Sequence, residues 1–179
     1  MAKKAEHKLK YEVIIKEFLE AREWSDELEI DLENLASSLN TGVNYDGGTL
    51  KLIIEAYDQS DLVDVFIYYG FNAKKAKLEE TTRLMNEINL RWRAGTFMAL
   101  PDGRVRWHHR VDFEGSQPTG KSIEQMVSAG FAAVEKFSDV VSAVAITKQT
   151  ALSAIEEYDA ALLAEQNAQE EDDEGPSEL

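Results

Sequence analysis

The residues at positions 115 to 122, GSQPTGKS, have the types and spacing that most directly suggest chemistry. They match the phosphate-loop pattern G-x-x-x-x-G-K-[ST], in which backbone N–H groups cradle phosphates while the lysine and the hydroxyl reach the outer phosphates and Mg²⁺. A nucleotide site would therefore use Gly115, Gly120, Lys121 and Ser122. The pattern has this meaning only where the loop leaves a buried parallel strand and opens a helix.

The segments around this loop favour a structural role for it. Residues 104–113 alternate between polar and apolar, whereas the strand that enters a phosphate loop is usually apolar on both faces. The residues after Ser122 show helical periodicity and then a polar tail, so no later strand completes a βαβ unit. Residues 122–125, SIEQ, fit a capping box, and Thr119 is an alternative N-cap. We therefore keep nucleotide binding only as the alternative function.

A second group of candidate residues lies in the run RVRWHHRVDF, which begins at Arg104. Side chains alternate between the two faces of a strand, so the run has a basic face and an apolar face. The basic face carries Arg104, Arg106, His108 and Arg110, and the apolar face carries Val105, Trp107, His109, Val111 and Phe113. Single-strand binders interleave cations and aromatic rings on one surface, but Trp107 lies opposite the arginines. With a net charge of −15, we expect a solvated or partner-facing surface and no nucleic-acid binding.

Other catalytic and metal-binding chemistry finds little support in the sequence. The chain has no cysteine, which excludes disulfides and thiolate sites. His108 and His109 point to opposite faces of a strand, and His7 lies near the N-terminus, so no zinc-type spacing exists. The carboxylates of Asp64, Asp112 and Glu114 are scattered without a pairing that predicts acid–base work. We expect no metal, no cofactor and no enzymatic activity.

The hydrophobic pattern predicts an N-terminal helix at 9–22 followed by three strands. In the helix one stripe carries Tyr11, Ile14, Ile15, Phe18 and Leu19. The strands, rich in β-branched and aromatic residues, are 37–45, 49–57 and 62–70. Short turns at 46–48, Asp-Gly-Gly, and at 58–61 join them, so we expect an antiparallel meander.

The second half of the chain predicts a helix, a hairpin and two more helices. Asn72 fits an N-cap for a helix over 73–92. Its apolar stripe carries Leu78, Thr82, Met85, Ile88 and Trp92. A hairpin turns at 101–104, and a long helix from Ser122 breaks near Thr147 before a fourth helix. The predicted order is α-β-β-β-α-β-β-α-α, an α+β domain with a five-stranded, mainly antiparallel sheet.

Composition predicts one domain with short tails. We expect the domain to span residues 9–164, between an N-terminal tail at 1–8 and an acidic tail at 165–179. The acidic tail, EQNAQEEDDEGPSEL, has no basic residue and few apolar ones, so we expect it to be disordered. No stretch resembles a signal peptide or a membrane span, which favours a cytoplasmic protein without membrane contact.

Several of these segments together resemble the YbjN family, bacterial sensory transduction regulators whose fold is similar to that of type III secretion chaperones. The resemblance runs from about Ser37 to Ala145. It rests on TLKLIIEAY, LVDVFIYYG, LMNEINLRW, GTFMALPDGRVRW and the long helix IEQMVSAGFAAVEKFSDVVSAVA. In such proteins an Asn in the central helix, here Asn86 or Asn89, precedes a strand that begins Gly-x-Phe.

The resemblance implies a protein-binding adaptor, regulator or chaperone-like domain of a bacterial stress or signalling pathway. It brings no catalytic residues. The candidate protein-binding residues are Arg104, Arg106, His108, Arg110 and Tyr68. Because uncovered strand edges invite pairing, we expect either a homodimer or the capture of an extended segment from a partner protein.

Overall fold

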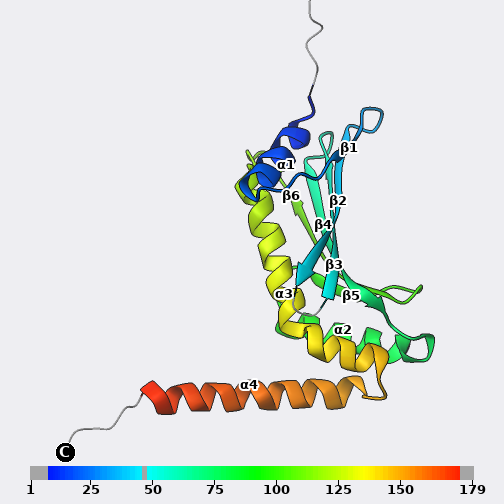
Figure 1. The fold of residues 1–179 in the computed structure, drawn as a ribbon, viewed down its shortest axis with the longest axis vertical. Helices are drawn as coiled ribbons and strands as arrows, with labels where there is room; N and C mark the ends of the chain where they lie inside the picture. Colours follow the sequence, from blue (N-terminus) through cyan, green and yellow to red (C-terminus); the bar gives the residue numbers. More distant parts are fainter. Residues whose placement is uncertain (1–7, 46–47, 174–179) are drawn as a thin grey trace, which may run out of the picture.

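The structure, a computed structural model, describes residues 8–45 and 48–173 (Figure 1). The helices are α1 (Lys10–Ala21), the short 3₁₀ helix η1 (Lys75–Lys77), α2 (Leu78–Arg91), α3 (Gly120–Ile146) and α4 (Ala151–Asp173). The strands are β1 (Leu28–Asp31), β2 (Ala36–Tyr45), β3 (Gly48–Tyr57), β4 (Leu62–Asn72), β5 (Thr96–Ala99) and β6 (Arg104–Asp112). The predicted break near Thr147 is confirmed, because α3 ends one residue before it.

The strands form one antiparallel sheet in the order β1-β2-β3-β4-β6-β5. The α+β class is therefore confirmed, but the predicted number of five strands is wrong, because the described residues form a sheet of six. The additional strand is β1, whose sequence LEID alternates for only four residues within an acidic stretch. Alternation over four residues is too short to separate a strand from a loop.

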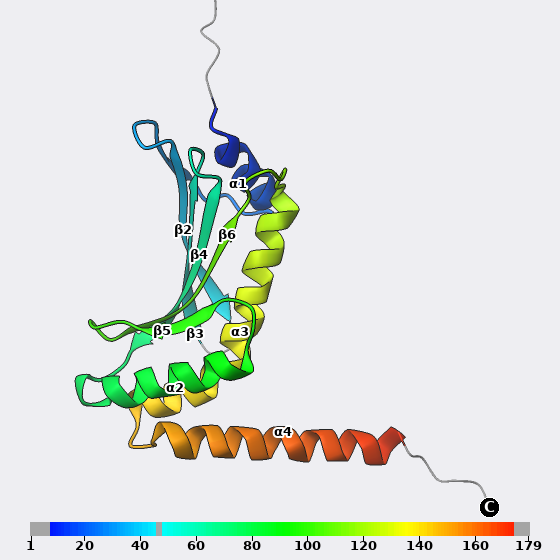
Figure 2. The ribbon, with the colours of Figure 1, turned by 180° about the vertical axis from the view of Figure 1, so that it is seen from behind.

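One face of the sheet is covered by helices, and the core lies between them. Figures 1 and 2 show α1 and α3 along the same face, with α2 and α4 beyond one end of the sheet. The predicted stripe of α1 is fully confirmed, since all five of its residues are buried. The opposite face carries no helix among the described residues, so its side chains remain free to meet solvent or a partner. We call it the outer face.

The centre of the core is Trp107 on β6, which has no exposed surface. Its indole Nε1 donates to the carbonyl of Ala94 at 2.8 Å. Helix α3 crosses the ring at Gly130, where a Cβ atom would lie 2.5 Å from the indole, so only glycine allows this close approach. Gly95, at φ +74°, would bring a Cβ equally close to the same ring. The sequence-based assignment of Trp107 to the packed face is confirmed.

Strand β5 is joined to α2 by Asn89. Its side-chain amide donates to the Phe97 carbonyl at 3.0 Å, and its oxygen accepts from the Phe97 N–H at 2.7 Å. This pair of bonds satisfies backbone groups on the outer edge of the sheet. Of the two asparagines that the sequence left open, Asn89 therefore performs this task, whereas Asn86 is exposed.

Three local predictions for the middle of the chain need correction or lie outside the structure. Asn72 is the last residue of β4 and not an N-cap, because the strand continues past Gly70 and α2 begins only at Leu78. Within α2 the predicted stripe is confirmed at Met85 and Ile88, which are buried, but it is wrong at Thr82, which is exposed. The helix buries Thr81, Leu84, Met85 and Ile88. The tip of the Asp-Gly-Gly turn, residues 46–47, lies outside the described residues.

Helix α4 extends beyond the predicted end of the domain at residue 164. Its first half packs on α2 and α3, and Arg91 of α2 forms an ion pair with Asp159 at 2.7 Å. From there α4 leads away from the domain (Figure 2) and continues to Asp173, so the first part of the segment expected to be disordered is helical. Residues 174–179 lie outside the described residues, as do residues 1–7 of the predicted N-terminal tail.

Candidate functional site

The outer face is organised in rows that run across the strands, as the pairing register shows. We name three of them by their chemistry. The acidic row is Glu29, Ser38, Glu55, Asp64 and Arg110. The middle row is Asn40, Ile53, Phe66, His108 and Thr96, and the basic row is Gly42, Lys51, Tyr68, Arg106 and Met98. The face therefore changes from negative to positive along the strands, with Ile53 and Phe66 between the two ends.

Asp64 is the buried charge of this face, with only 1% of its surface exposed. Its carboxylate accepts two hydrogen bonds from Arg110, both at 2.8 Å, and shares a third with Nε2 of His108 at 2.6 Å. Burial opposes ionisation, but the bonds from Arg110 and His108 outweigh it and hold the pKa of Asp64 below its usual value. Asp64 thus fixes two of the predicted site residues in place.

Phe66 forms an aromatic and cationic stack with its neighbours on β6. The His108 ring lies parallel to it, with centroids 4.5 Å apart, and the Arg106 guanidinium lies 4.6 Å from the Phe66 centroid. Arg106 also donates to the Tyr68 hydroxyl at 2.8 Å. Its Nε is buried without a hydrogen-bond partner, and no carboxylate pairs with this guanidinium within the described part of the chain. Arg106 is therefore a rigidly held cation without a counter-charge.

All five residues predicted for protein binding lie on the outer face. Arg104 completes the group at the start of β6, where it pairs with Asp102 at 2.7 Å and lies 5.4 Å from the Tyr68 ring centroid. The sequence predicted that the basic side chains share one face, and the structure confirms this. Their role in binding stays a prediction. Phe66 and Asp64 were not predicted, because a lone aromatic or carboxylate in a strand has no sequence signal until its neighbours are known.

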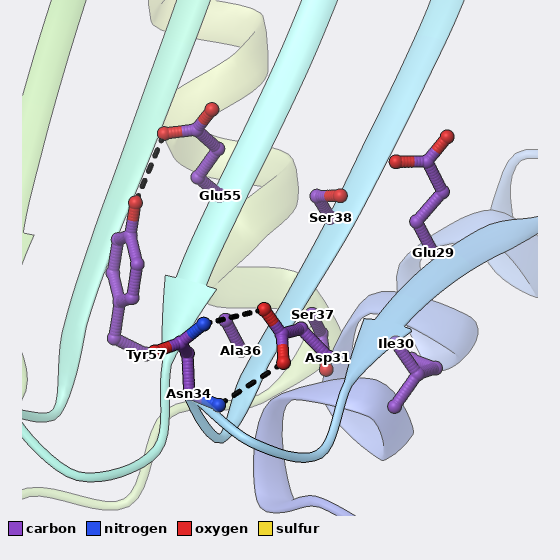
Figure 3. Close-up of a pocket in the computed structure, with 9 residues that line it drawn as sticks. All are labelled: Glu29, Ile30, Asp31, Asn34, Ala36, Ser37, Ser38, Glu55 and Tyr57. Carbon is purple, nitrogen blue, oxygen red and sulfur yellow. Dashed lines mark hydrogen bonds between the residues drawn. The ribbon is translucent and has the colours of Figure 1, made fainter.

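A shallow pocket of about 460 Å³ lies at the acidic end of the outer face (Figure 3). Glu29, Ser38 and Glu55 line it side by side from three adjacent strands. The Tyr57 hydroxyl donates to Glu55 at 3.1 Å. The pKa of Tyr57 is raised, mainly by burial and then by the negative charge of Glu55. Asp31 is held by the side chain of Asn34. Sequence reasoning missed this pocket because it missed β1.

The loop GSQPTGKS lies in an antiparallel setting, since β6 pairs antiparallel with both β4 and β5. The N-terminus of α3 already carries an anion, because the Gly120 N–H donates to a carboxylate oxygen of Glu17 at 3.1 Å. Lys121 is exposed and Gly115 has φ +73°. Ser122 Oγ accepts from the Thr119 N–H at 3.1 Å, so Thr119 is the N-cap and the predicted Ser122–Gln125 box is wrong. One backbone N–H at the start of α3 is thus already bonded to a carboxylate of the chain itself.

No group of three or more histidine or carboxylate side chains gathers as a metal ion would require within residues 8–45 and 48–173. None of the helices in these ranges combines the length and apolar composition of a membrane span.

The comparisons with known proteins agree with the resemblance noted above. The fold is similar to two solved structures. The ExsC-ExsE complex matches at 13% identity and a TM-score of 0.52, over 75% of this chain and 97% of that chain. The HopA1-SchA chaperone-effector complex matches at 10% identity and a TM-score of 0.46, over 73% and 94%. No curated protein matches the sequence.

A family model settles the family. The model for YbjN, described as "Putative bacterial sensory transduction regulator", matches residues 13–143, which is most of the chain. The matched range contains all of the sheet and most of α1 and α3. The chain belongs to the YbjN family.

Proposed function

We propose that this chain is a non-enzymatic, protein-binding regulator or chaperone-like domain of a bacterial stress or signalling pathway, and that it binds through the outer face. The observation that carries this proposal is a sheet face that no helix of the described residues covers, with the half-buried apolar side chains of Ile53 and Phe66 in its middle row. Exposed apolar surface rimmed by polar residues marks interaction sites in soluble proteins. The proposal keeps the sequence expectation of one cytoplasmic domain over residues 9–164.

The arrangement of the outer face suits protein recognition in a second respect. Arginine and large aromatic residues carry much of the energy in protein interfaces, above all where they are already immobilised. Arg106 is held between Phe66 and Tyr68, so little side-chain freedom remains to be lost on binding. A carboxylate or carbonyl from a partner would meet a guanidinium that lacks a counter-charge.

The comparisons support this class of function without naming a partner. The YbjN family is described as regulatory. The similar fold in the ExsC-ExsE complex occurs in a protein that is bound to another protein. A fold hosts many functions, so the choice of the outer face rests on the residues described above.

The test is affinity capture from the native lysate with matched variants. Phe66→Ser combined with Arg106→Glu alters the outer face, and Glu20→Lys alters the exposed side of α1. Circular dichroism and melting temperature first verify that both variants fold. We expect proteins captured by the wild type and by Glu20→Lys to be lost with the outer-face variant. Equal capture by all three would place binding elsewhere and contradict the proposal.

A further inference from the structure

We propose that the protein bound on the outer face is a second copy of this chain, packed face to face across a two-fold axis that follows the middle row. This inference rests on the proposed function and adds the identity of the partner. Two sheets that pack face to face keep their strands within about 30° of one another and lie about 10 Å apart. A two-fold axis that is perpendicular to the strands satisfies this geometry.

The positions of Lys51 and Glu55 on β3 make the face self-complementary. Ile53 lies midway between them, two residues from each, and all three point to the outer face. Rotation about an axis through Ile53 therefore places Lys51 against Glu55 of the second copy, and Glu55 against Lys51 of the second copy. Each such contact occurs twice, as an isologous interface requires.

The other rows obey the same symmetry. Ile53 and Phe66 of the middle row lie on the axis and meet their own copies, which removes apolar surface from water. The axis also brings Arg106 near Arg110 of the second copy. That contact is tolerable because Asp64 already neutralises Arg110 through two hydrogen bonds. The net result is apolar contact at the centre and opposite charges on β3.

The charge balance of the outer face also permits self-association. The chain carries a net charge of −15, so two copies repel one another over most of their surface. The strands of the outer face are nearly balanced, since five carboxylates face four cations there. They are Glu29, Asp31, Glu55, Asp64 and Asp112, and Lys51, Arg104, Arg106 and Arg110. A second copy can approach here without a large electrostatic cost.

The size of the face predicts a weak and salt-dependent dimer. The four long strands β2, β3, β4 and β6, at about 3.3 Å per residue and about 4.8 Å apart, cover roughly 600 Å². Stable interfaces bury about 800 Å² on each partner, so this area belongs to the weaker class. We therefore expect a dimer that dissociates on dilution within the micromolar range, and weaker association when salt screens the charge pairs.

The experiment is sedimentation equilibrium of the intact chain at about 5 to 200 μM, at low and at high salt. Lys51→Glu and Glu55→Lys each place like charges against one another, so each should weaken the dimer by about tenfold or more. The double variant K51E/E55K exchanges the two charges and restores both pairs. Its dimer should return to near wild-type strength. Glu20→Lys is the control, because it changes the net charge by the same amount as Glu55→Lys. Position 20 lies on α1, away from the outer face, so this variant should not weaken the dimer.

Three results would overturn the inference. They are a wild type that stays monomeric at every concentration, a dimer that the single variants do not weaken, and a double variant as weak as the singles. These outcomes are separable from failure of the proposed function. If the chain is monomeric but still captures other proteins through the outer face, only the assignment of the partner as a second copy is wrong. If the outer-face variant captures the same proteins as the wild type, the proposed function itself is contradicted.

Discussion

Replacing Asp64 by asparagine removes a buried charge of the outer face while keeping the shape of the side chain. Asp64 accepts three charge-assisted hydrogen bonds between 2.6 and 2.8 Å. Such bonds contribute about 1.5 to 3 kcal/mol each in favourable cases. The Arg110 side chain is 57% exposed and can be hydrated in the variant, so we discount the sum. We expect Asp64→Asn to lower the free energy of unfolding by about 2 to 3 kcal/mol near neutral pH.

The loss has a defined pH dependence. The folded pKa of Asp64 lies below its unfolded value, so its charge stabilises the fold fully above the unfolded pKa of about 4. This stabilisation disappears as the pH falls through the lower, folded pKa. The difference between wild type and Asp64→Asn should therefore be constant above about pH 5 and shrink below about pH 4.

Urea unfolding followed by tryptophan fluorescence, between pH 3 and pH 8, measures this difference directly. In a thermal melt it corresponds to a shift of roughly 5 to 10 °C for a chain of this size. Asp139→Asn on the exposed side of α3 is the matched control and should change little. A variant as stable as the wild type near pH 7, or a deficit that persists unchanged at pH 3, would refute the reasoning.

Three further substitutions probe other contacts. Asn89→Ala removes both bonds to the β5 backbone and should cost about 1 to 3 kcal/mol in urea unfolding, whereas exposed Asn86→Ala should cost less than about 0.5 kcal/mol. Equal costs would contradict the assignment of Asn89. Gly130→Ala drives a methyl group into Trp107 and should destabilise by about 1 to 3 kcal/mol, with a changed tryptophan emission spectrum; an unaltered spectrum and stability would argue against this close packing. Adding Mg-ATP should not change the melting temperature of the wild type or of Lys121→Ala. If Mg-ATP raised the melting temperature of the wild type and Lys121→Ala abolished this rise, the nucleotide hypothesis would be restored.

Alternation and helical periodicity were sufficient to predict the parts of the fold that the chain determines locally. The two faces of β6 followed from period-two alternation, so the gathering of the basic side chains could be predicted without a structure. The stripe of α1 followed from helical spacing in the same way. The confirmed hairpin between β5 and β6 followed from its Pro-Asp-Gly turn.

The remaining features depend on contacts between distant residues. Glu17 contacts the N-terminus of α3 from more than a hundred residues away in the sequence. The loop sequence GSQPTGKS therefore could not reveal that a carboxylate of the same chain bonds the Gly120 N–H. The three carboxylates of the acidic row come from β1, β3 and β4, and they are seen to lie in one row only once the register of the sheet is known. Asp64 had no distinguishing signal, because its partners lie on β6.

Photo-crosslinking in the native host tests most directly whether the outer face binds protein. A photoreactive amino acid at Lys51 samples the outer face, and the same probe at Glu20 samples the exposed side of α1. We predict protein crosslinks from position 51 and not from position 20, with a product of twice the chain mass if the partner is a second copy. Crosslinks from position 20 alone, or from neither position, would contradict the assignment of the outer face as the binding surface.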